Sequence, residues 1–127
     1  MLQKLKISFS KNVQILDADV FSNLIELQEL HLSDSCIEFI DKTLFSNLIN
    51  LKKLDLVGNE IKSIKAKSFS NLHNLESLDL SSNRLKSLSA KSFVGLDNLK
   101  ELDLSHNKLV KFDLKIFDNI GKFVEIY

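Results

Sequence analysis

The sequence predicts an α/β solenoid, in which short coils of chain stack side by side. One parallel sheet is expected on one side of the stack, with turns or 3₁₀ segments on the other. The first observation is a 24-residue period of one apolar pattern, whose successive copies open at Leu27, Leu51, Leu75, Leu99 and Phe123. The second is an alternation of apolar and variable residues at the start of each copy, which is the period of a strand. Because such short strands can bury their leucines only against neighbouring copies, a repeat array is expected.

The array is expected to form a single domain over residues 1–127. Its copies span residues 2–26, 27–50, 51–74, 75–98 and 99–122, with a partial copy at 123–127. One strand is expected in each copy, and in the third copy Leu54 and Leu56 should face the core. The expected strands lie near residues 4–8, 29–33, 53–57, 77–81, 101–105 and 125–127. The opposite segments, such as residues 65–68 and 89–92, are too short for regular helices and should form turns or 3₁₀ turns.

Two residue types recur at fixed places outside the strands. An Asn where the chain leaves the strand can bond backbone groups of its own and adjacent copies, so a buried ladder is predicted. Its members are Asn59, Asn83 and Asn107, and Ser35 stands at this place one copy earlier. A Phe on the opposite side of each copy is predicted to stack into a core spine. These residues are Phe21, Phe45, Phe69, Phe93 and Phe117.

Eight constrained positions per copy follow the pattern L-x-x-L-x-L-x-x-N-x-L-x-x-L-x-x-x-x-F-x-x-L-x-x. This pattern resembles the leucine-rich repeat family in its 24-residue typical class. The resemblance implies a curved solenoid with the parallel sheet on its concave side and protein recognition through that side. Toll-type receptor ectodomains and secreted insect immune proteins of this repeat class are similar. Relatives often carry Pro at the start of the convex segment, and this chain has no Pro.

Composition excludes several classes of function. With 17 basic and 17 acidic residues the chain is neutral, which argues against nucleic acid as a general partner. No apolar run approaches membrane-spanning length, so direct membrane insertion by this segment is not expected. No Gly-rich phosphate loop is present, and His31 and His106 should lie roughly 14 Å apart at strand spacing, too far to share a metal. We therefore expect no enzyme, no cofactor and no metal site.

Charge is unevenly distributed along the copies. From Leu75 onward, the charged residues at the presented strand positions are acidic except for Lys100, and they are Glu76, Asp79, Glu101, Asp103 and Glu125. The other segments of the last three full copies carry Lys62, Lys65, Lys67, Arg84, Lys86, Lys91, Lys108, Lys111 and Lys115. An acidic concave surface could steer a basic partner. Simple solvation of both surfaces is the alternative.

One column of the predicted sheet stands out. It contains Lys6, His31, Asp55, Asp79, Asp103 and Tyr127. The three stacked carboxylates either hold a cation or a partner's basic side chain, or form an exposed structural column. The predicted partner-binding residues on the concave face are His31, Lys53, Asp55, Glu76, Asp79, Glu101, Asp103 and His106.

The leading hypothesis is a non-enzymatic module that binds a protein ligand within an innate-immune receptor or cell-adhesion protein. The alternatives are an intracellular scaffold or regulatory subunit and a structural spacer of a longer solenoid. The resemblance favours an extracellular or cell-surface location, with the cytoplasm as the alternative. The lone Cys36 cannot form an internal disulfide, so it is either a partly buried thiol or pairs with another chain. Because no polar cap is visible at either end, the chain is expected to be a fragment or to self-associate through its ends.

Overall fold

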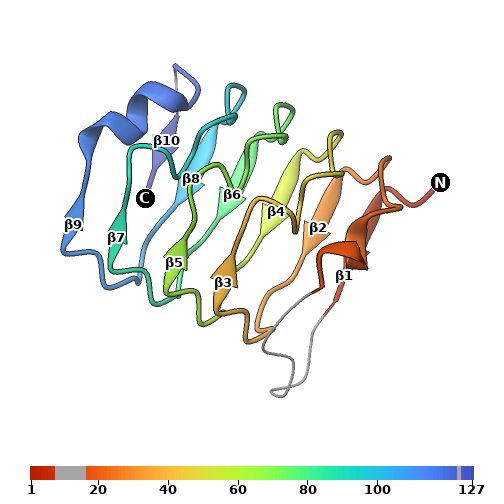
Figure 1. Cartoon of the computed structure of the whole chain (residues 1–127), viewed down its shortest axis with the longest axis horizontal. Coiled ribbons are helices and arrows are strands. Elements are labelled where there is room, and N and C mark those ends of the chain that lie inside the picture. Colours follow the sequence, from red (N-terminus) through yellow and green to blue (C-terminus); the bar gives the residue numbers. More distant parts are fainter. Residues whose placement is uncertain (8–16, 123) are drawn as a thin grey trace.

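The computed structural model describes residues 1–7, 17–122 and 124–127, which form a solenoid of stacked coils (Figure 1). Each coil contributes one short strand to a six-stranded parallel sheet in the order β1-β2-β4-β6-β8-β10. The strands are β1 (Lys4–Lys6), β2 (Glu29–His31), β4 (Lys53–Asp55), β6 (Ser77–Asp79), β8 (Glu101–Asp103) and β10 (Glu125–Ile126). The predicted fold class is therefore confirmed, and each strand lies within its predicted segment.

The sheet keeps the 24-residue register of the sequence. Leu30 pairs with Leu54, which is followed in the next two strands by Leu78 and Leu102. These central leucines are buried, whereas the residues on either side of them in each strand stay partly or fully exposed. Because side chains alternate across a strand, one face of the sheet covers the core and the other is presented.

A second row of strands, which the sequence did not predict, lies on the other side of the core (Figure 1). Here β3 (Phe39–Ile40) pairs with β5 (Ser63–Ile64), and β7 (Ser87–Leu88) pairs with β9 (Lys111–Phe112). Turns follow β5 and β7, as expected. The 3₁₀ helices η1 (Ala18–Phe21) and η2 (Leu114–Asn119) occupy the same place in the first and last full coils. The described residues contain no α-helix.

Four stacked phenylalanines run through the core. The ring centroids of Phe21, Phe45, Phe69 and Phe93 are 6.2, 6.2 and 6.3 Å apart in succession. Neighbouring strands of a sheet are only about 4.8 Å apart, so the wider Phe spacing fits an array that curves with the sheet on its inner side. The prediction of a buried Phe117 is wrong, because this side chain is 38% exposed. In this coil η2 replaces the turn, and Ile116 is its fully buried side chain.

Side-chain amides tie each coil to the one before it. Asn83 accepts the Ile61 N–H through Oδ1 at 3.0 Å and donates through Nδ2 to Leu56 O at 2.9 Å and Leu80 O at 3.0 Å. Asn59 and Asn107 make the corresponding bonds in their own coils. The amide therefore satisfies backbone groups that the end of each strand leaves open.

Two further rows of Asn on the outer side of the coils were missed by the sequence analysis. In the first row, Asn47 and Asn71 donate to the carbonyls of Ser22 and Ser46 in the preceding coil. The second row makes the same kind of bond, and its members are Asn50, Asn74 and Asn98. Their recurrence at 24-residue intervals was the signal available in the sequence.

We expect Asn83→Ala to reduce the free energy of unfolding by about 1–3 kcal/mol, and by more than Ser35→Ala does. The first change leaves one buried N–H and three carbonyls, those of Leu56, Leu80 and Ser81, without this amide partner. The buried Ser35 hydroxyl donates to Ser33 O at 3.1 Å and lies 3.4 Å from Ile7 O. A hydroxyl has one hydrogen to donate, whereas the Asn83 amide has two and also accepts the Ile61 N–H. Urea unfolding of both variants measures the difference. Equal midpoints would contradict a structural role for the Asn83 amide.

Candidate partner-binding face

The presented face of the sheet consists of the outward residues of the six parallel strands. Strand register places His31 beside Asp55, which is followed in turn by Asp79 and Asp103. Lys6 pairs with His31 at the other end of this column. Most of the predicted partner-binding residues therefore share one surface, as the strand period requires.

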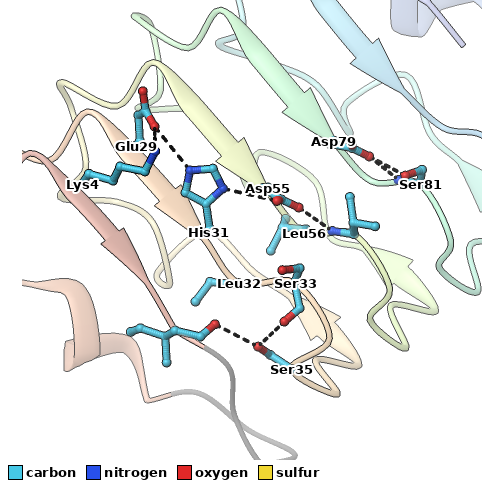
Figure 2. A network of polar contacts seen from close by, with 12 residues as sticks. Lys4, Glu29, His31, Leu32, Ser33, Ser35, Asp55, Leu56, Asp79 and Ser81 are labelled. Atoms are coloured by element: carbon cyan, nitrogen blue, oxygen red, sulfur yellow. Dashed lines mark hydrogen bonds and ion pairs between the residues drawn. The ribbon is translucent and has the colours of Figure 1, made fainter.

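On the part of the face formed by β1, β2 and β4, the carboxylates have basic neighbours within the sheet (Figure 2). The Lys4 ammonium lies 2.9 Å from the Glu29 carboxylate, and His31 Nε2 lies 3.4 Å from the same group. The other ring nitrogen, His31 Nδ1, lies 3.3 Å from Asp55 Oδ2. Hydrogen bonds from Lys4 and then from His31 hold the pKa of Glu29 below its ordinary value. The two carboxylates here, Glu29 and Asp55, are thus matched by Lys4 and the His31 ring, and Lys6 and Lys53 add positive charge, so this part carries no negative excess. We call it the balanced part of the face.

The part of the face on β6, β8 and β10 is different. Its outward residues include Asp79, Glu101, Asp103 and Glu125, and the structure gives none of them a cation partner among the described residues. The Tyr127 hydroxyl donates to Glu125 at 2.8 Å, which raises the pKa of Tyr127. We call these four carboxylates the acidic half of the face. Uncompensated charge of one sign on adjacent strands produces a negative potential in front of the sheet.

Glu76 and Lys53 lie beside the acidic half. Glu76 precedes β6 and pairs at 2.8 Å with Lys100, and this contact lowers the pKa of Glu76. Lys53 is exposed on β4, the strand of the balanced part that pairs with β6 of the acidic half. The sequence-based grouping of Glu76 with the free carboxylates is therefore incomplete, because its charge is matched by the neighbouring coil.

The aspartate column has a local structural role. Oδ1 of Asp79 accepts the Ser81 N–H at 2.9 Å and the Ser81 hydroxyl at 2.6 Å (Figure 2), and Asp103 bonds Ser105 in the same way. Oδ1 of Asp55 accepts a backbone N–H two residues on as well. Such side-chain turns stabilise the bend at the end of a strand. In each of these aspartates, Oδ1 therefore stabilises the turn that follows the strand.

His106 lies in the turn after β8, not on the strand itself. Its φ is 54°, and the equivalent residues of the other coils share this left-handed conformation. They are Asp34, Gly58 and Ser82. His106 is exposed at the border of the face, two coils beyond the Asp55 carboxylate that contacts His31.

No group of three or more His, Cys, Asp or Glu side chains among the described residues is arranged to hold a metal ion. No helix in the same part of the chain is both long and apolar enough to span a membrane. Cys36 is a half-buried free thiol next to Ser35.

The repeat pattern, the parallel sheet and the Asn ladder identify the class: the chain belongs to the leucine-rich repeat family. The family profile matches residues 1–61 and 49–109, and a second profile of the same description matches residues 98–123. A search of curated proteins gives no significant match by sequence.

Among solved structures, the chain is similar to the Toll ectodomain in the Toll–Spätzle complex of Drosophila, described as a molecular hub in development and innate immunity. This match has 28% identity and a TM-score of 0.91, and it covers 99% of this chain and 16% of the other. A glycosylated form of that complex matches with 30% identity and a TM-score of 0.84, over 91% of this chain and 15% of the other. The chain thus spans about a sixth of the length of the structures that it matches.

Proposed function

We propose that this chain is a non-enzymatic recognition module of an extracellular receptor or secreted immune protein, and that it binds a protein partner through the concave face of the sheet. The observation that carries the proposal is the contrast between the balanced part of the face and its acidic half. The similarity to the Toll ectodomain supports both the protein partner and the extracellular location.

The proposed contact lies on the acidic half, and the partner presents Lys or Arg side chains to it. Charges that are already paired within the sheet, such as Lys4 with Glu29, gain little from a partner because their field is largely cancelled. The carboxylates of Asp79, Glu101 and Asp103 have no such internal partner. Complementary charge of this kind acts mainly on the association rate and its dependence on salt.

Neutralising the acidic half tests this proposal. Asp79→Asn with Asp103→Asn removes two charges but keeps the side-chain oxygen that accepts from Ser81 or Ser105. With Spätzle as the probe, we expect the association rate to fall roughly tenfold and to depend less on salt. Surface plasmon resonance at two salt concentrations measures both quantities.

The matched control is Asp19→Asn with Asp118→Asn, which removes two exposed charges from the 3₁₀ helices instead. This pair should bind as the unmodified chain does. If the control weakens association as much as the sheet variant, the interface is not on the acidic half. If Spätzle does not bind the unmodified chain, the ligand of Toll is not a ligand of this chain.

A further inference from the structure

A second charged surface lies on the outer side of the coils. It consists of three equivalent segments at residues 57–68, 81–92 and 105–116, which we call the basic arms. They contain nine of the 17 basic residues of the chain but only two of its 17 acidic residues. All nine basic side chains are exposed, and they are Lys62, Lys65, Lys67, Arg84, Lys86, Lys91, Lys108, Lys111 and Lys115. Because the chain as a whole has zero net charge, this excess of basic residues is a property of the basic arms and not of the whole surface.

Among the described residues, the ion pairs between the basic arms and acidic residues of preceding coils become fewer toward the C-terminal end of the array. Lys62 lies 2.8 Å from Glu38 in the preceding coil, and Arg84 lies 3.4 Å from Glu60. One coil further on, the same register sets Lys86 next to Lys62 and Lys108 next to Arg84. Like charges on neighbouring strands repel and are destabilising, so a bound anion would stabilise these arms.

A third row of cations joins all three arms. Lys67, Lys91 and Lys115 occupy the same position in successive coils, and the Lys67 N–H donates to Lys91 O at 3.0 Å. A shallow hollow of about 470 Å³ lies over the paired strands β7 and β9 within this surface. It is lined by Ser87, Leu88, Ser89, Lys111 and Asp113. Oδ1 of the Asp113 carboxylate accepts the Lys115 N–H at 2.9 Å, which holds this side chain to the start of η2.

We propose that the basic arms bind a linear sulfated polysaccharide, with a sulfate group seated at the hollow over the paired strands β7 and β9. Hydroxyl groups and an ammonium around a hollow suit a sulfate, since they donate hydrogen bonds and positive charge together. Rows of cations that cross three coils suit a chain whose negative charges repeat along its length. Single-stranded nucleic acid is disfavoured because its binding sites stack successive bases on several exposed aromatic rings. The described side chains of the basic arms include no exposed Phe, Tyr or Trp, and the neighbouring exposed ring, Phe39, has the Lys62 ammonium 6.0 Å from its centroid.

This surface is separate from the acidic half of the sheet, because the buried leucine and Phe core lies between them. A polysaccharide on the basic arms therefore leaves the concave face open to a protein. The inference does not depend on the proposed function, and each surface can be disabled without changing the other.

The test measures binding of a size-defined heparin fragment by isothermal titration calorimetry. The test variant is Lys86→Gln with Lys111→Gln, and the matched control is Lys42→Gln with Lys52→Gln, two exposed lysines outside the basic arms. We expect the dissociation constant to rise about tenfold or more in the test variant, and the salt dependence to become shallower, as it does for other polyanions. The control should bind as the unmodified chain does. Circular dichroism and urea midpoints confirm that both variants are folded.

Two further probes distinguish recognition of sulfate groups from binding to negative charge in general. Desulfated heparin should bind at least tenfold more weakly than heparin, and single-stranded DNA of equal charge should also bind more weakly. Equal loss of heparin affinity in the test and control variants would overturn the proposal, as would an absence of binding. DNA that binds as tightly as heparin would show instead that the basic arms are a nucleic-acid surface.

Discussion

Phe69→Ala is expected to lower the free energy of unfolding by about 3–5 kcal/mol, the usual cost of emptying a large aromatic site in a core. The Phe69 ring is fully buried at the centre of the array. It stacks on Phe45 at 6.2 Å and on Phe93 at 6.3 Å, so the truncation removes two ring contacts as well as apolar burial. The neighbouring coils are held by the sheet and by their amides, so collapse around the cavity should be incomplete.

Urea unfolding followed by circular dichroism measures this effect, with Phe117→Ala as the control. Because Phe117 is 38% exposed, its truncation should cost less than half as much as that of Phe69. A lower m-value is also expected for Phe69→Ala, since a weak central interface lets the two ends of a repeat array unfold separately. Equal losses at both positions would contradict the stacked spine.

Gly95→Ala is expected to destabilise the chain by about 2–4 kcal/mol, through backbone strain and overlap together. Gly95 has a φ of +97°, which residues with a Cβ rarely adopt. A Cβ at this position would lie 2.4 Å from Ser70 O and 2.6 Å from Ser70 Cα in the preceding coil. Both atoms belong to the backbone, so the two coils would have to move apart.

Gly58→Ala is the matched control, because Gly58 also has a positive φ, of +68°. Its added Cβ would meet Asp34 Oδ1, which is the end of a side chain that can rotate away. We therefore expect a loss of only about 1–2 kcal/mol, the cost of the left-handed conformation. Thermal unfolding of the two variants compares them directly. A Gly58 variant less stable than the Gly95 variant would contradict the close approach at Ser70.

The strands of the sheet could be predicted because each of them buries a leucine flanked by presented residues. Leu54 and Leu78 define a strand face by themselves, and the 24-residue register then pairs them. The outer strands could not be predicted in this way. β5 and β7 are two residues long, and each buries only one side chain, Ile64 or Leu88, so no alternation is visible.

The residues that share the presented face could be predicted from the strand period, but their charge balance could not. Charges in the sequence can be assigned to a surface, whereas the structure pairs them by register. Six of the seven ion pairs among the described residues join positions 24 or 25 apart, as in Lys62 with Glu38. A comparison of each charge with the residue one repeat away would have shown that β1, β2 and β4 are balanced and that the acidic half is not.

The turn role of Asp79 and Asp103 had a visible signal as well. Each is followed two residues later by Ser, and this spacing suits a side-chain turn. The exposure of Phe117 had no comparable signal. It depends on the local path of η2, and the sequence pattern at this place matches that of the buried Phe93 one coil earlier.

The constant register between coils makes each coil an interchangeable part. Deletion of residues 51–74 would bring Glu38 next to Lys86, as it now lies next to Lys62, and would set Phe45 against Phe93. Asn83 would then stand one coil after Ser35, where Asn59 now accepts the Ser35 N–H. The joints between coils would be of the same kind as before, so a chain of this design can grow or shorten during evolution by whole coils while its surfaces keep their character.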